Sequence, residues 1–170
     1  MKKILQITLV GFLSAFISCG DAATDGDATT DDTSSASSAD VAPAPVNPVI
    51  TKTIQLSSGQ EVPANNSTAT GSADLSYNKD TKTLSYTVNY SGLTGDAAMA
   101  HIHGTAAKGA NAGVAHDLTG VLQKAASGNF SDSVKVGDKI NEDSLLTGFY
   151  YFNIHTKKNP GGEIRGQIEF

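Results

Sequence analysis

From residue 49 onward the chain consists of short segments in which polar and apolar residues alternate, with turn-forming residues between the segments. Side chains point to opposite faces along a β-strand, so this alternation indicates strands that are buried on one face. No long run repeats its apolar residues with the 3.6-residue period of a helix. The sequence therefore predicts an all-β domain, an antiparallel sandwich or barrel of about eight short strands.

Clusters of turn-forming residues give the limits of these segments. The expected strands cover residues 50–56, 75–77, 84–90, 97–103, 130–136, 149–155 and 163–170. Residues 78–81 predict a hairpin between the second and third segments, and residues 157–162 predict another between the last two. Residues 141–146 are expected to form at most one helical turn, with Asn141 as its cap.

The first 18 residues have the pattern of an export signal. Two lysines precede an apolar run over residues 4–17, which is too short to span a bilayer and has the length of a signal-peptide core. Cys19, the only cysteine, follows with small residues on both sides. The segment resembles a bacterial lipoprotein leader, which implies cleavage before Cys19 and membrane anchoring through lipids on that residue. An ordinary secretory leader with an incidental cysteine is the alternative.

Residues 19–48 have almost no large apolar residue, so we expect a disordered tether. The tether holds six aspartates and no basic residue, whereas residues 49–170 hold ten basic and eleven acidic residues. A nearly neutral domain on an acidic stalk argues against nucleic acid as a partner. The acidic run resembles the export signal of some bacterial surface lipoproteins, and a solvated spacer is the alternative. We expect an exported protein at the outer membrane or cell surface, with the periplasmic face as the other location.

Two of the four histidines lie two residues apart, in the expected strand at 97–103. Residues i and i+2 of a strand share a face about 7 Å apart, so His101 and His103 leave the same side of the sheet. Alternation predicts that Ala98, Ala100 and Ile102 face the core and that Met99 and both histidines face away from it.

The last two expected strands add polar side chains to the outer side. Alternation places His155 there, together with Glu163 and Arg165. These two charges share a face and are expected to form an exposed ion pair, worth less than about 1 kcal/mol. The glycine-rich residues 104–113 are available to cover the histidines, which is the arrangement of a site.

Three motifs connect this domain with a known family. They are Leu-Ser-Ser-Gly-Gln-Glu-Val-Pro at 56–63, Ala-His-Ile-His-Gly at 100–104, and Asn-Ile-His-Thr followed by Asn-Pro-Gly-Gly-Glu-Ile-Arg-Gly-Gln within 153–167. In this order and spacing they resemble the CHRD domain, a module repeated in the animal protein chordin and found in bacterial extracytoplasmic proteins. The resemblance covers residues 49–170. It implies an immunoglobulin-like β-barrel and, for bacterial members, no settled biochemical activity.

A weaker resemblance concerns the order of the histidines. Copper–zinc superoxide dismutases also carry His-x-His on a barrel strand, then a histidine shortly after, another much later and an arginine near the end. Here these positions are His101, His103, His116, His155 and Arg165. The chain departs from that family in having no cysteine pair and no loop rich in His and Asp for a zinc site.

One hypothesis is a metal site. His101, His103 and His155 would bind copper or zinc, both of which imidazole nitrogens suit, with His116 as a further candidate ligand. An open position on copper would permit redox chemistry with a small oxidant, and Arg165 would help to attract an anion.

Two other interpretations remain open. In one, the histidines serve structure alone, with hydrogen bonds to loop carbonyls that hold residues 104–113 and 156–162 in place. The first functional interpretation is a non-catalytic binding module, as in chordin, with Tyr151 and Arg165 on a surface that contacts an unidentified protein or small ligand. A hydrolase is disfavoured because the sequence has no Gly-x-Ser-x-Gly elbow, phosphate loop or Cys-His pair.

Overall fold

A computed structural model describes residues 48–170 of the protein. The expected leader, Cys19 and the tether up to residue 47 lie outside the described residues, so they remain predictions. Within the described part of the chain, no helix has the length and apolar character needed to cross a membrane.

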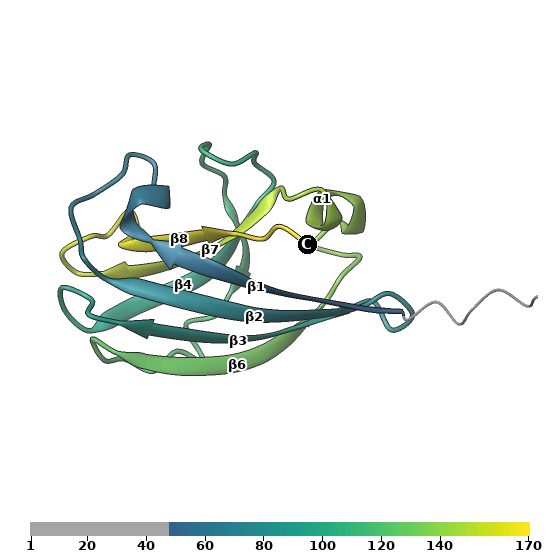
Figure 1. The fold of residues 1–170 in the computed structure, drawn as a ribbon, viewed down its shortest axis with the longest axis horizontal. Helices are drawn as coiled ribbons and strands as arrows, with labels where there is room; N and C mark the ends of the chain where they lie inside the picture. Colours follow the sequence, from purple (N-terminus) through teal and green to yellow (C-terminus); the bar gives the residue numbers. More distant parts are fainter. Residues whose placement is uncertain (1–47) are drawn as a thin grey trace, which may run out of the picture. The chain divides into compact units, whose positions relative to one another are not determined.

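The described chain forms eight antiparallel strands, as the sequence predicts, together with one 3₁₀ turn and one short helix (Figure 1). The elements are β1 (Val49–Ser57), η1 (Ser58–Gln60), β2 (Thr70–Asn78), β3 (Thr83–Ser91), β4 (Ala97–Gly104), β5 (Val114–Asp117), β6 (Gly128–Lys135), α1 (Glu142–Leu146), β7 (Tyr150–Thr156) and β8 (Ile164–Gln167). All eight strands belong to one sheet in the order β5-β4-β7-β8-β1-β2-β3-β6.

The sheet curls into a half-barrel, so that one of its faces encloses the core (Figure 1). Tyr86 on β3 and Phe152 on β7 show the curl, because β8, β1 and β2 separate their strands in the sheet. Their rings nevertheless meet edge to face at a centroid distance of 5.2 Å. The core is therefore lined by every second residue of strands that are far apart in the sheet.

Alternation correctly predicts which residues face this core, except at the start of β4, where Ala97 is buried in place of Ala98 because the pairing with β7 shifts register there. Ala100, Ile102, Phe152, Ile154 and Ile164 are all buried in it. Six residues of the last two expected strands were predicted to lie on the other side of the sheet, and all six are buried as well. These outer residues are Tyr151, Asn153, His155, Glu163, Arg165 and Gln167. Loops cover this part of the outer face and enclose a second, polar interior.

The structure differs from the expected elements at three strands. β8 covers only Ile164–Gln167 of the expected segment 163–170. β2 begins at Thr70, five residues before the expected segment, because Gly71 and Ala73 pair with β1 and β3 although they lack strand-typical side chains. β5 was not predicted, because it has four residues, contacts only β4 and shows no clear alternation. The expected helical turn is present as α1, and the side chain of Asn141 accepts a hydrogen bond from the backbone N–H of Ser144.

Candidate metal centre

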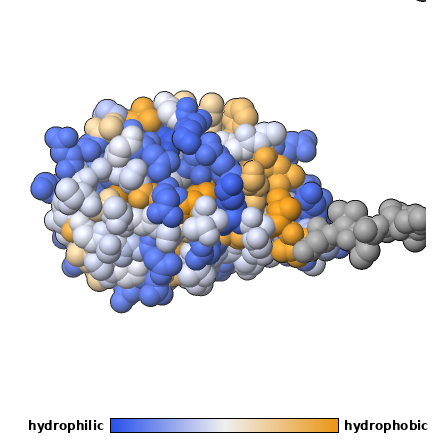
Figure 2. All heavy atoms as spheres, in the orientation of Figure 1, coloured by the Kyte–Doolittle hydropathy of each residue, from blue (hydrophilic) through white to orange (hydrophobic). Residues whose placement is uncertain are grey.

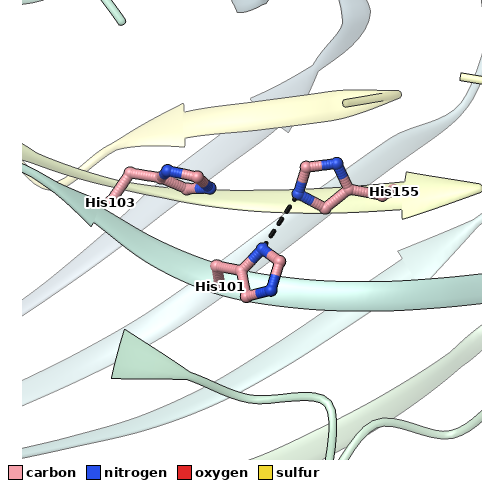
Figure 3. Close-up of side chains that lie close together, drawn as sticks. All are labelled: His101, His103 and His155. Atoms are coloured by element: carbon pink, nitrogen blue, oxygen red, sulfur yellow. Dashed lines mark hydrogen bonds between the residues drawn. The ribbon is translucent and has the colours of Figure 1, made fainter. Parts of the chain in front are cut away.

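Three histidines meet on the outer face of the sheet. His101 and His103 lie on β4, and His155 lies on the neighbouring strand β7. Nδ1 of His101 is 3.0 Å from Nε2 of His155, and one ring nitrogen from each histidine lies within 4.8 Å of those of the other two. Figure 3 shows the three rings turned toward a common point. The fold thus brings together residues that are more than 50 positions apart in the sequence.

Backbone carbonyls determine which nitrogen carries the proton in two of these rings. Nδ1 of His103 is 3.0 Å from the carbonyl oxygen of Ala112, and Nδ1 of His155 is 3.0 Å from that of Pro160. A carbonyl oxygen can only accept, so Nδ1 donates in each neutral ring and Nε2 keeps its lone pair. The covering loops therefore direct two Nε2 lone pairs into the cluster.

One of these two lone pairs accepts no hydrogen bond. Nε2 of His103 is buried and has no hydrogen-bond partner among the described residues. A buried polar atom without a partner costs about 1–3 kcal/mol. A metal ion at the centre of the cluster would use this lone pair.

Burial lowers the pKa of all three histidines. For His155, the loss of water outweighs the hydrogen bond to Pro160, and the nearby His101 and His103 add to the effect, so the pKa falls to about 4. For His101, burial outweighs the attraction of the Asp117 carboxylate and the pKa is again lowered. All three rings are therefore neutral at neutral pH, which is the form that binds a metal.

The spacing of the nitrogens suits a single ion. Metal–imidazole bonds are about 2.0–2.1 Å long, so two nitrogens on a tetrahedral ion lie about 3.4 Å apart. The nitrogens of His101 and His155 are 3.0 Å apart, and no pair in the cluster exceeds 4.8 Å. The widest pair would have to close by at most about 1.4 Å to reach the tetrahedral spacing.

Asp117 provides a partner for the remaining nitrogen of His101. Without a metal, Nδ1–H of His101 donates to the lone pair of His155. If Nδ1 bound a metal, the proton would move to Nε2, which lies 3.7 Å from Oδ1 of Asp117. A carboxylate near the distal nitrogen of a ligating histidine stabilises that tautomer.

Tyr151 holds the His103 ring in its orientation. The two rings are stacked, with an interplanar angle of 5° and a centroid distance of 5.0 Å. The guanidinium carbon of Arg165 lies 3.4 Å from the Tyr151 ring centroid. Since β4 and β8 flank β7 on opposite sides, Tyr151 stands between the histidine and the arginine.

Arg165 does not lie on the surface, where the sequence interpretation placed it as an anion or partner contact. Its side chain is 1% exposed. The guanidinium donates to the side-chain oxygens of Asn111 and Gln167 and to the carbonyl oxygen of Ala110. The loop at 105–113 covers Arg165 and also Tyr151, so these two residues cannot form the exposed surface expected of them.

Sequence reasoning assigned no role to Glu61, which lies beside the cluster. Asn153 on β7 pairs with His101 on one side and with Arg165 on the other. Its side chain donates hydrogen bonds of 2.9 and 3.0 Å to the two carboxylate oxygens of Glu61. Burial raises the pKa of Glu61 to about 7, against the opposing effects of the Arg165 charge and the Asn153 hydrogen bond. The only signal in the sequence was the position of Glu61 inside the motif at 56–63.

Glu163 does not form the expected exposed ion pair with Arg165. It is 0% exposed, and its carboxylate accepts hydrogen bonds from the hydroxyls of Ser67, Thr94 and Thr156 and from the backbone N–H of Thr94. Burial favours the neutral acid, but these hydrogen bonds outweigh it and lower the pKa of Glu163 to about 2. Because Thr156 follows His155 directly, this carboxylate anchors the end of β7 that carries the third histidine.

His116 is not part of the cluster, although the sequence interpretation included it as a candidate ligand. It lies on β5 opposite Ile102 of β4. Directly paired residues share a face of the sheet, and Ile102 is in the core. His116 therefore leaves the sheet on the side opposite to His101 and His103.

Comparison with known proteins identifies the domain. The family model described as "CHRD domain" matches residues 52–168, a span that includes the three histidines, Glu61 and Glu163. Comparisons with curated proteins and with solved structures found no match.

Proposed function

The chain belongs to the CHRD domain family, and we propose that in this protein the domain is a binding module for a copper or zinc ion, held by His101, His103 and His155. The observation that carries the proposal is the convergence of the three rings while Nε2 of His103 is buried without a partner. Neutral imidazoles are ligands for both metals, and copper binds more tightly in the usual order.

A purely structural role for the histidines accounts for only part of the arrangement. The Nδ1 atoms of His103 and His155 hold the covering loops, as that role requires. A structural role does not explain why the Nε2 sides of both rings face a third histidine. Buried polar atoms normally have a hydrogen-bond partner, and Nε2 of His103 has none among the described residues. A metal ion accounts for both edges: one nitrogen binds the ion and the other is fixed by a carbonyl.

A protein-binding surface, as in chordin, has less support. The large apolar side chains that are exposed in the described region are Met99, Val114, Val121 and Phe149. They include only one aromatic residue. In Figure 2 the visible face has one apolar band near its right-hand end, and its other apolar groups are small and separated by polar surface. Scattered exposed apolar residues of this kind are ordinary and do not mark an interface.

We also propose that the domain is lipid-anchored through Cys19 on the acidic tether and faces the outside of the cell or the periplasm. Support comes from the layout of the leader, in which the only cysteine follows the apolar run after a single serine. Replacing Cys19 by alanine is expected to move the protein from the membrane fraction to the soluble fraction. Retention of the variant in membranes would contradict the anchor.

The metal proposal is tested on full-length protein purified without an affinity tag or chelator. Elemental analysis is followed by removal of metal and by titration with Cu²⁺ or Zn²⁺ against a chromogenic chelator. We expect one ion per chain, and we expect His103→Ala and His155→Ala each to lower the affinity by about 100-fold or more.

His116→Ala is the matched control, because it removes an imidazole outside the cluster and should leave the affinity unchanged. Circular dichroism verifies that each variant is folded. Folded wild-type protein that takes up neither metal, or equal affinity in all four proteins, would overturn the proposal.

A further inference from the structure

A methionine lies beside the histidine cluster, on the same face of the sheet. Met99 precedes His101 by two residues on β4, so their side chains share the outer face. In the pairing of β4 with β7, Met99 lies directly opposite His155. Paired residues have Cβ atoms about 4.5–5.5 Å apart, so the Met99 side chain starts next to two of the three imidazoles.

The side chain of Met99 is not packed into the core, because it lies on the outer face of β4 and is 39% exposed. Methionine is unbranched and has three rotatable side-chain bonds that let its sulfur reach positions at different distances. The thioether sulfur needs no deprotonation and is a soft ligand that favours copper(I).

The charges around the cluster also favour a monovalent ion. None of the grouped ligands is a carboxylate, and the Asp117 carboxylate lies 3.7 Å from Nε2 of His101, the nitrogen that would not bind the ion. The buried guanidinium of Arg165 lies behind Tyr151, which stacks on His103, and this positive charge disfavours further positive charge at the cluster. A divalent ion in a partly buried site without an anionic ligand has a larger desolvation cost than a monovalent ion.

We propose that the sulfur of Met99 is a fourth ligand of the cluster and that the site selects copper(I) over zinc. This inference rests on the proposed metal-binding function and specifies which ion that function serves. The sulfur would close the side of the cluster next to His155, where Met99 is the exposed residue of β4.

The chain has few sulfur atoms, so a sulfur neighbour of copper can be assigned by spectroscopy. Its sulfur-containing residues are Met1, Cys19 and Met99, so Met99 supplies the only sulfur in the described residues. Full-length wild-type protein and the Met99→Leu variant are loaded with copper(I) without oxygen and examined by copper X-ray absorption spectroscopy. We expect a sulfur neighbour of copper in the wild type and its loss in the variant.

Affinity measurements on the same two proteins test the selectivity. Leucine keeps the size and apolar character of methionine, so the variant should fold. We expect Met99→Leu to lower copper(I) affinity by about tenfold or more, against a chromogenic copper(I) chelator, and to change zinc affinity by less than about threefold.

The possible outcomes separate this inference from the proposed function. Three outcomes would each overturn the role of Met99 and leave the histidine site standing. These are copper bound by nitrogen alone, equal copper(I) affinity in both proteins, and a sulfur signal that persists in Met99→Leu and so comes from Cys19 or Met1. Failure of the folded wild-type protein to bind either metal would overturn both.

Discussion

Nδ1 of His101 lies 3.0 Å from Nε2 of His155, although 53 residues separate the two histidines in the sequence. The two residues are diagonal neighbours across β4 and β7, because His101 pairs with Asn153 and His155 pairs with Met99. Diagonal neighbours on one face are within reach of long side chains. The register of two adjacent strands is therefore enough to assemble the candidate site, and the covering loops fix its orientation.

Replacing Glu163 by glutamine should destabilise the domain. The amide presents N–H groups to hydroxyls that now donate to the carboxylate, and it lacks the negative charge. We expect the free energy of unfolding at pH 7 to fall by about 3 kcal/mol, measured by urea denaturation. Glu169→Gln is the control, since Glu169 forms only an exposed pair with Lys108 and should cost less than about 1 kcal/mol.

The stabilisation from Glu163 has a defined pH dependence. The pKa of Glu163 is about 2 in the folded protein and 4.5 in an unfolded chain. Its contribution to the free energy of unfolding is therefore complete above about pH 4.5 and is lost as the pH falls toward 2. The difference in stability between the wild type and Glu163→Gln should shrink over the same range. A difference that is constant from pH 7 to pH 3 would contradict this account of the carboxylate.

Glu61 should produce a pH dependence of the opposite sign. Burial raises its folded-state pKa to about 7, so its contribution to stability is complete below about pH 4.5 and is lost as the pH rises through 7. Relative to Glu61→Gln, which does not ionise, metal-free wild-type protein should lose up to about 3 kcal/mol between pH 5 and pH 8. If the difference in free energy of unfolding between the two proteins is the same at pH 5 and pH 8, Glu61 is not buried in this way.

Gly162 should tolerate no side chain. Its φ is +132°, and a Cβ would lie 2.4 Å from Nδ2 of Asn153 and 2.6 Å from Oε1 of Glu61. We expect Gly162→Ala to lower stability by about 2 kcal/mol and to weaken metal binding, because the same loop carries the Pro160 carbonyl that orients His155.

The neighbouring glycine provides a matched control. A Cβ at Gly161 would meet nothing within 4 Å, so Gly161→Ala should change stability by less than about 0.5 kcal/mol. Thermal unfolding and metal competition on both variants measure the effect. Equal behaviour of the two variants would show that the contact with Asn153 and Glu61 is not a constraint.

Local pattern was sufficient to predict the all-β fold and the facing of the strands that carry the site. The side-chain period of two identifies the core residues of β4, β7 and β8, and so places His101, His103 and His155 together on the other face. Alternation gives the face of a side chain and nothing about what covers that face.

The errors have the same physical origin. Arg165 and Glu163 are buried because loops distant in the sequence fold over them and supply hydrogen bonds. Such contacts leave no periodic signal in the strands. His116 was misplaced because β5 is too short to show alternation, so its facing depends on pairing with Ile102. Glu61 lies outside any strand, and only the fold places it against Asn153.

The most direct test of the account is ¹⁵N NMR of the imidazole side chains in the full-length protein, recorded before and after addition of one equivalent of Zn²⁺ or copper(I). In the metal-free protein, Nε2 of His103 and His155 should be unprotonated. On addition of metal, we expect the signals of these two atoms and of Nδ1 of His101 to shift together, while those of His116 stay in place. Unchanged signals from the three histidines, or shifts confined to His116, would contradict a shared metal site.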